Sequence, residues 1–249
     1  MSVVRTALVV GGRRGIGAAV VRKLAAQGVA VTYTYRSEPS GLEEFRAELP
    51  GATLDAVQLD LADRAAVDAF ALVQEDAPAW DVLVQVSGMT YDALAAMMDQ
   101  NAAEQAMQVN YFAFARIARA VVRPMTRARS GRIVAVGSVI GQVASQGNAA
   151  YGASKAALLA YVRSLATESA KRGVTVNYIA PGFVDTEMMA PFAAYRAAAE
   201  NRIPVGRFAA PEEVAAAVAF LASREAGYIT GAYIPVDGGL TASIGIPRG

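Results

Sequence analysis

Short runs of apolar residues alternate with longer amphipathic stretches along almost the whole chain. The first run, from Thr6 to Val10, is closed by glycine, and the next segment carries Ile16, Val20 and Leu24 at helical spacing. A short apolar run bounded by turn residues predicts a buried strand, and apolar positions three or four residues apart predict an amphipathic helix. The pattern predicts seven strands, at residues 6–10, 29–35, 54–59, 80–86, 132–138, 174–179 and 233–236.

Helical patterns separate these strands. They follow the first glycine turn as far as Gly28, then occupy residues 41–49, 64–74, 102–128 and 149–172, and a last helix opens at Pro211. Strands that alternate with helices at close intervals, without a linker or a repeat, predict an α/β protein with a doubly wound parallel sheet. We therefore expect a Rossmann fold of about seven strands, with helices on both faces, in one dinucleotide-binding domain over residues 1–249.

The segment from Glu187 to Pro204 is rich in alanine and methionine and has no clear strand character. It is interpreted either as a mobile helical lid over a site, because closing loops commonly become ordered on substrate, or as a plain surface helix.

Composition limits the classes of protein that remain. Hydrophobic residues make up 54% of the chain, yet no apolar run approaches the roughly 20 residues of a membrane span. The strand pattern begins almost at once, without the charged start, apolar core and cleavage site of a signal peptide. We expect a soluble cytoplasmic protein with no membrane partner.

The chain contains no cysteine and no histidine. Disulfides, cysteine nucleophiles, Ser–His–Asp triads and the usual zinc sites are therefore excluded, and no metal is expected. Acid–base chemistry is left to Tyr, Lys, Asp, Glu and Ser. The net charge of +1 gives no indication of nucleic-acid binding.

Charge is distributed unevenly, since no acidic residue lies between Glu104 and Glu168. Four arginines within this interval recur at helical spacing and form one stripe on the helix predicted at 102–128. The stripe either faces an anionic partner or pairs with acids from elsewhere in the fold. Its members are Arg116, Arg119, Arg123 and Arg127.

The first strand runs directly into a glycine-rich turn that opens a helix. Gly11, Gly15 and Gly17, with Ile16 between the last two, follow the spacing G-x-x-x-G-x-G. Glycines permit a tight turn and close approach of the backbone, and the helix N-terminus favours a phosphate. The turn predicts dinucleotide binding.

Arginines in the glycine turn and after the second strand indicate which of the two nicotinamide dinucleotides binds. An acidic residue that binds a ribose hydroxyl commonly follows the second strand in NAD sites, but Arg36 and Ser37 stand here. With Arg13 and Arg14 in the glycine turn, these residues favour the 2′-phosphate of NADPH. The alternative is that they are solvent-exposed loop arginines.

Further candidate residues follow the ends of other predicted strands. Ligands in doubly wound sheets lie beyond the carboxyl ends of the strands, so these residues are expected to meet at one site. Tyr151 and Lys155 lie four residues apart, hence on one face of the helix that follows Ser138. A phenol beside a cation is a proton donor with tunable acidity, and Ser138 is placed to hydrogen-bond the same substrate oxygen. The other strand-end residues are Asp60, Leu61, Ser87 and Gly88.

The chain resembles the short-chain dehydrogenase/reductase family over essentially its whole length. The resemblance rests on the glycine turn, Asp60-Leu61, Asn110, Ser138, Tyr151 with Lys155, and Pro181-Gly182. Within the family it is most similar to the 3-oxoacyl-[acyl-carrier-protein] reductases. That closer likeness is carried by Gly131-Arg132-Ile133, Gly137-Ser138-Val139, Tyr228-Ile229-Thr230-Gly231 and Val236-Asp237-Gly238-Gly239.

The resemblance implies a proton relay at a substrate carbonyl. Tyr151 would donate the proton, Ser138 would polarise the oxygen, Lys155 would lower the pKa of Tyr151 and grip the nicotinamide ribose, and Asn110 would hold a water. Asp60 would contact the adenine and Thr186 the carboxamide.

The resemblance also implies a larger cofactor site and two kinds of protein partner. Arg129 and Arg172 match positions that meet an acidic acyl carrier protein bearing a 3-oxoacyl chain, and a homotetramer is implied. The remaining cofactor contacts implied are Leu61, Ser87, Gly88, Pro181, Gly182 and Val184.

Two departures stand out. Val10 replaces the usual threonine before the first glycine, and Gln85-Val86-Ser87-Gly88 replaces the family's Asn-Asn-Ala-Gly. They favour a diverged paralogue, and a ketoreductase of polyketide or aryl-polyene assembly is as compatible as a fatty acid enzyme. Reduction of a free ketone, aldehyde, sugar or steroid, and a non-catalytic cofactor-binding subunit, are the alternative functions.

Overall fold

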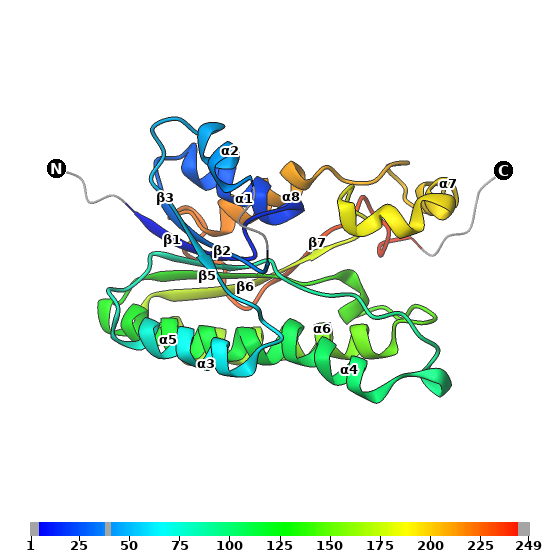
Figure 1. Cartoon of the computed structure of the whole chain (residues 1–249), viewed down its shortest axis with the longest axis horizontal. Helices are drawn as coiled ribbons and strands as arrows, with labels where there is room; N and C mark the ends of the chain where they lie inside the picture. The colour runs from blue at the N-terminus through cyan, green and yellow to red at the C-terminus, as the bar shows by residue number, and fades with distance from the viewer. Residues whose placement is uncertain (1–4, 38–40, 244–249) are drawn as a thin grey trace.

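The computed structural model describes residues 5–37 and 41–243, and it has a seven-stranded sheet as its centre. All six neighbouring pairs are parallel, in the order β3-β2-β1-β4-β5-β6-β7 (Figure 1). The strands are β1 (Thr6–Val10), β2 (Ala30–Tyr35), β3 (Leu54–Gln58), β4 (Val82–Gln85), β5 (Gly131–Val136), β6 (Val174–Pro181) and β7 (Tyr233–Val236). This is the doubly wound Rossmann topology that the apolar pattern predicts.

Helices cover both faces of the sheet (Figure 1). On one face lie α1 (Gly15–Ala25), α2 (Leu42–Ala47) and α8 (Pro211–Leu221); on the other lie α3 (Arg64–Asp76), α5 (Ala113–Ala128) and α6 (Ala149–Ser169). Two apolar clusters, one on each face, consequently hold the three layers together, and strands buried on both sides read as continuous apolar runs.

Shorter elements complete the chain around the edges of the sheet. They are η1 (Ala95–Met97), α4 (Gln100–Met107), η2 (Gln108–Phe112), η3 (Val139–Gly141), η4 (Ala170–Arg172), η5 (Glu187–Tyr195) and α7 (Arg196–Glu200). In Figure 1, α4 and α7 extend beyond the carboxyl ends of the strands, on opposite sides. They flank the edge where a doubly wound sheet binds its ligands.

Two expected elements differ from the structure in detail. The single helix expected at 102–128 is three consecutive segments, because η2 is a π-helical turn between α4 and α5. The expected lid at 187–204 is helical over Glu187–Glu200, as a 3-10 segment followed by α7, and then turns. Its backbone is described throughout, but the side chains of residues 190–193 lie outside the description.

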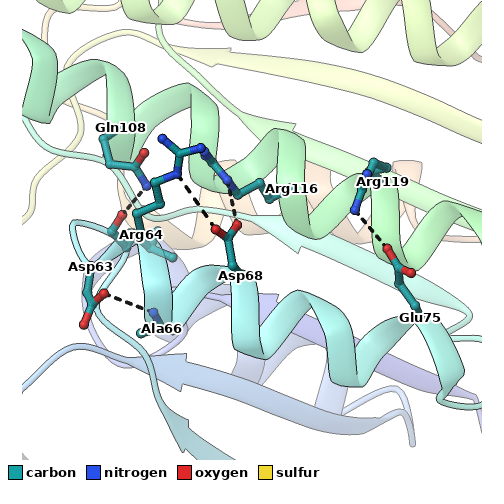
Figure 2. A network of polar contacts seen from close by, with 9 residues as sticks. Asp63, Arg64, Ala66, Asp68, Glu75, Gln108, Arg116 and Arg119 are labelled. Carbon is teal, nitrogen blue, oxygen red and sulfur yellow. Dashed lines mark hydrogen bonds and ion pairs between the residues drawn. The ribbon is translucent and has the colours of Figure 1, made fainter.

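The arginine stripe pairs with acidic residues of the neighbouring helix. Arg116 bonds Asp68 at 2.8 Å, and Arg119 lies 3.1 Å from Glu75, both between α5 and α3 (Figure 2). Arg123 of α5 also lies 3.1 Å from Glu75. Arg127 donates to the Glu75 carbonyl at 3.4 Å. Of the two interpretations of this stripe, pairing within the fold is the one that the structure bears out.

Among the helices of the described residues, none is both long and apolar enough to cross a membrane.

Candidate active site

The carboxyl ends of the strands surround a largely apolar pocket of about 520 Å³. Three of the predicted polar residues lie at its wall: Ser138 after β5, and Tyr151 and Lys155 on α6. Ile16 of the glycine turn and the segment after β6 complete the same pocket, since its lining includes Gly88, Pro181, Gly182, Val184 and Thr186. Residues from five separate segments thus meet as the topology predicts.

Ser138 follows the end of β5 in an extended conformation and caps η3. Its hydroxyl oxygen accepts a hydrogen bond from the Ile140 amide at 3.2 Å. A hydroxyl carries one proton and two lone pairs, so this bond leaves the Ser138 proton available for donation. Burial raises the pKa of Tyr151, and the hydrogen bond of the Ser138 hydroxyl to the Tyr151 phenol offsets part of this rise.

Tyr151 and Lys155 face the same pocket from consecutive turns of α6. The Lys155 ammonium lies 5.6 Å from the centre of the Tyr151 ring and is almost completely buried. Burial lowers the pKa of Lys155 to about 8, because a desolvated cation is disfavoured.

Burial also raises the pKa of Tyr151 above that of a free phenol, and the Asp92 carboxylate raises it further. This direction is opposite to the lowering by Lys155 that the family resemblance implies, because desolvation outweighs the other effects. The phenol is therefore protonated at neutral pH, as a proton donor must be.

Asn110 lies in the π-helical turn and is completely buried. Its side-chain oxygen accepts from the Met89 amide at 2.9 Å, and its side-chain nitrogen donates to the Met89 carbonyl and the Ser154 hydroxyl, each at 2.9 Å. These contacts join α6 to the loop after β4. They engage both polar atoms of the side chain, so the role in holding a water that the resemblance implies for Asn110 is not evident from its side-chain contacts.

The backbone of the glycine turn packs closely at the N-terminus of α1. A β-carbon on Gly17 would lie 1.9 Å from the Gly11 carbonyl oxygen, and one on Gly11 would lie 2.0 Å from the Ser87 hydroxyl oxygen. Gly11 and Gly15 also have positive φ angles, of 87° and 51°. The first turn of α1 carries no acidic side chain. A tight backbone cradle at a helix N-terminus fits the pyrophosphate of a dinucleotide.

The arginines expected at the adenosine end are arranged differently from one another. Arg13 lies over α2, with its guanidinium carbon 5.8 Å from the centre of the Phe45 ring. Arg14 pairs with Glu187 at 3.2 Å. Arg36 and Ser37 are exposed after β2, at the same edge of the sheet.

The remaining predicted cofactor residues lie at the strand ends as expected. Asp60 is exposed after β3 and accepts from the Ala62 amide at 2.9 Å, whereas Leu61 beside it is buried. Ser87 donates its amide to the Val10 carbonyl at 3.0 Å. A β-carbon on Gly88 would lie 3.0 Å from the Lys155 nitrogen, so the loop after β4 passes directly beside that ammonium.

Several pocket residues carry no motif that would identify them from the sequence. The apolar wall includes Ile140 after β5 and the stacked rings of Phe183 and Phe208, whose centres are 5.2 Å apart. Asp92 and Asn148, which share a short hydrogen bond, lie at the polar side. The segment expected to form a lid contributes Met188, Met189, Tyr195, Arg196 and Ala199 to the pocket.

Arg129 and Arg172 lie apart from this pocket. Each lies two residues before a strand, Arg129 before β5 and Arg172 before β6, and the first residues of these strands, Gly131 and Val174, pair in the sheet. Both arginines are exposed, and the Arg129 guanidinium donates to the Lys171 carbonyl at 3.4 Å. They are neighbours at the amino edge of the sheet, opposite the edge that carries Ser138.

Comparison with known sequences identifies close relatives of the whole chain. The family described as "Enoyl-(Acyl carrier protein) reductase" matches residues 10–241. The 3-oxoacyl-[acyl-carrier-protein] reductase FabG of Escherichia coli is 39% identical over 238 residues, covering 95% of this chain and 97% of the relative. MabA of Mycobacterium bovis, of the same description, is 40% identical over 240 residues, with 95% and 92% covered.

Solved structures show the same arrangement of the chain. A short-chain dehydrogenase/reductase from Serratia marcescens has a TM-score of 0.88 at 32% identity, with 95% of this chain and 98% of that chain covered. A protein described as an NAD(P)-dependent gluconate 5-dehydrogenase from Beutenbergia cavernae, with NADP bound at low occupancy, has a TM-score of 0.91 at 36% identity, with 96% and 97% covered. Fold, site and relatives agree, and this chain is an oxidoreductase of the short-chain dehydrogenase/reductase family.

Proposed function

We propose that this protein reduces a 3-oxoacyl thioester, carried by an acyl carrier protein, to the 3-hydroxyacyl thioester with NADPH. One observation carries the proposal. Ser138, Tyr151 and Lys155 gather at the wall of an apolar pocket that opens beside a dinucleotide cradle. The identity of 38–40% to 3-oxoacyl-[acyl-carrier-protein] reductases over nearly the whole chain supports the choice of substrate.

Ser138 and Tyr151 are assigned to the substrate carbonyl. The Ser138 hydroxyl donates to the carbonyl oxygen and holds it, and Tyr151 gives its proton to the same oxygen as negative charge develops there. Lys155, held by burial beside Tyr151, provides the positive charge that stabilises the resulting phenolate. Asn110 fixes the loop after β4 against α6 and so keeps this group together.

The cradle of Gly11, Gly15 and Gly17 is assigned to the pyrophosphate of the cofactor, which supplies the hydride when bound. Arg13, Arg14, Arg36 and Ser37 are assigned to the 2′-phosphate of NADPH. Arg13 belongs to the glycine turn, and its guanidinium lies over Phe45 of α2. The absence of an acidic residue directly after β2 favours NADPH over NADH.

The other cofactor contacts are assigned by their places at the strand ends. Asp60 and Leu61 are assigned to the adenine and Thr186 to the carboxamide. The wall between them is assigned to Ile16, Ser87, Gly88, Pro181, Gly182 and Val184.

The apolar pocket favours an acyl chain over a polar substrate. Its surface is more apolar than polar, and its methionine, phenylalanine and isoleucine side chains suit an acyl chain. Residues 187–204 are assigned as the lid of this single domain, because Met188, Met189 and Tyr195 already face the pocket.

Arg129 and Arg172 are assigned to the acidic carrier protein. Since they lie at the edge opposite the pocket of their own chain, this assignment goes together with a homotetramer in which another subunit supplies the pocket. Fatty acid synthesis and specialised assembly of polyketide or aryl-polyene chains both fit this substrate class.

The decisive experiment measures oxidation of NADPH by the purified protein with a 3-oxoacyl thioester, with and without a carrier protein. We expect turnover, a strong preference for NADPH over NADH, and a loss of about 10³-fold or more in Tyr151→Phe, which removes only the acidic hydroxyl. Unchanged turnover in Tyr151→Phe contradicts the assignment of the proton donor. Binding of NADPH without turnover on any ketone would indicate a non-catalytic cofactor-binding subunit.

A second comparison separates a tethered substrate from a free ketone, aldehyde or steroid. Arg129→Ala with Arg172→Ala should raise KM for the carrier-bound thioester and leave the small ketone unaffected. The control is Arg119→Ala with Arg123→Ala, which removes the same charge from the arginines paired with Glu75. An equal rise in KM in the two double variants would show that the overall positive charge of the protein, and not a contact of Arg129 and Arg172, attracts the carrier protein.

A further inference from the structure

Tyr178 connects the two elements that carry the proposed catalytic groups, although it lies outside the pocket. It belongs to β6 and is completely buried. Its hydroxyl oxygen accepts from the Ser138 amide at 2.9 Å. The same hydroxyl lies 3.2 Å from the Ser138 carbonyl oxygen and 3.4 Å from the Lys155 carbonyl oxygen. One side chain therefore reaches the end of β5 and the backbone of α6.

Glycines make this position available to an aromatic ring. A β-carbon on Gly137 would lie 1.9 Å from the Tyr178 hydroxyl oxygen, and one on Gly141 would lie 3.2 Å from it. On its other side, the ring stacks on Tyr233 with centres 5.7 Å apart and planes 15° apart. The ring is fixed between β7 and the turn after β5.

At the end of β5, the Tyr178 hydroxyl replaces a backbone carbonyl as the hydrogen-bond acceptor. The last ladder bond of β5 runs from the Gly137 amide to the Ile179 carbonyl, at 2.8 Å. The next amide, of Ser138, is donated to the Tyr178 hydroxyl instead. A buried amide without a partner is costly, so this bond determines where the chain leaves the sheet and which way Ser138 points.

The proton of the same hydroxyl is shared with carbonyl acceptors. A phenol has one proton to donate, and both the Ser138 and the Lys155 carbonyls lie within reach. Burial raises the pKa of Tyr178, which keeps that proton in place across the physiological range. The Lys155 carbonyl lies on α6, four residues from Tyr151.

We propose that Tyr178 is a positioning residue for the reaction, which sets the distance between the Ser138 hydroxyl and the Tyr151–Lys155 pair by tying the end of β5 to α6. The inference rests on the proposed function, because it gives Tyr178 a part in the same proton transfer. It adds a residue that acts through the backbone of others. Its loss should affect the chemical step more than binding, since catalysis depends on sub-ångström placement.

The test compares Tyr178→Phe with Tyr233→Phe. Both changes remove one phenolic hydroxyl from the same stacked pair and retain the ring. Ser138→Ala and the double variant Ser138→Ala with Tyr178→Phe complete a double-mutant cycle. The measurements are kcat and KM for a 3-oxoacyl thioester, the Kd of NADPH by fluorescence, and Tm.

We expect kcat of Tyr178→Phe to fall about tenfold, with KM and the NADPH Kd changed less than about twofold, and Tyr233→Phe to match the wild type. In the double variant, Tyr178→Phe should cost little beyond Ser138→Ala, because residues that act as a unit are not additive. Fully multiplicative losses, or a lower Tm with unchanged kcat, would overturn the inference. So would an equal fall in Tyr233→Phe.

The proposed function is tested separately by the wild-type protein. If the wild type turns over a 3-oxoacyl thioester while Tyr178→Phe matches it in kcat, the proposed function stands and the role of Tyr178 is wrong. If the wild type turns over no thioester, the proposed function fails first, and the role of Tyr178 in this reaction fails with it.

Discussion

Arg14 and Glu187 form an ion pair of 3.2 Å between the glycine turn and the first residue of η5. The two side chains are 68% and 78% exposed, so the pair is weak and readily exchanged for another partner. Arg14 is also assigned to the 2′-phosphate of NADPH. In the proposed function, Glu187 and the cofactor therefore compete for the same guanidinium.

Removing the charge of Glu187 should free Arg14 for the cofactor. Glu187→Gln should lower KM for NADPH about two- to threefold and leave KM for NADH unchanged, because an exposed ion pair is worth well under about 1 kcal/mol. The control is Glu200→Gln, which removes a pairing of Arg196 within the lid segment and leaves Arg14 untouched. The same change for both cofactors, or none for either, would show that Arg14 does not meet the 2′-phosphate.

Lys155 provides a prediction about stability and pH. Burial lowers its pKa from 10.5 to about 8, so the unfolded chain binds more protons than the folded one between these values. The folded state of the cofactor-free wild type therefore loses stability as pH falls from about 10.5 to 8. Lys155→Met lacks this penalty and should be more stable below pH 8, by about 3 kcal/mol, and no more stable above pH 10.5.

This expectation is checked by urea unfolding at a series of pH values. The exposed Lys171 gives the control, since Lys171→Met should track the wild type throughout. If the free energies of unfolding of Lys155→Met and the wild type differ by the same amount at every pH, the Lys155 ammonium is not the cause of the difference in stability.

Gly137 and Tyr178 give a prediction about packing. Gly137→Ala would place a methyl group on the Tyr178 hydroxyl, so it should destabilise the protein by about 1–3 kcal/mol. Combining it with Tyr178→Leu, which vacates that space, should cost less than the sum of the two single changes. If the loss in the free energy of unfolding of the double variant equals the sum of the two single losses, the strain in Gly137→Ala does not come from contact with Tyr178.

Asp92 gives a prediction about the acidity of Tyr151. Its carboxylate lines the pocket and raises the pKa of Tyr151. Asp92→Asn removes the charge and retains an oxygen for the hydrogen bond from Asn148. The pH profile of alcohol oxidation, which needs a phenolate, should shift to lower pH by less than about one unit. Asp99→Asn, at the start of α4, should leave the profile in place.

The fold and the core of the site follow from the sequence because they depend on local patterns. Short apolar runs bounded by turn or polar residues predict all seven strands, and a spacing of four places Tyr151 and Lys155 on one face of α6. The raised pKa of Tyr151 does not follow, because desolvation depends on what the fold packs around the phenol. The π-helical turn at Asn110 depends in the same way on contacts with Met89 and Ser154.

Ion pairs and hydrogen bonds between residues far apart in the chain cannot be predicted from the sequence, because they too depend on how the fold packs. Nothing in the spacing of the α5 arginines reveals that Asp68 and Glu75 lie opposite them on α3. Tyr178 reads from the sequence as an ordinary apolar strand residue, and only the fold brings its hydroxyl to Ser138.

The buried Lys155 allows proton uptake or release on cofactor binding to be measured by calorimetry. Since the chain has no histidine and no cysteine, and Lys155 has a pKa of about 8, few other side chains change charge between about pH 6 and 9. Cofactor titrations by calorimetry, repeated in buffers of different ionisation enthalpy, will report net proton uptake or release on binding. The difference between the wild type and Lys155→Met in this number is the part that belongs to the Lys155 ammonium.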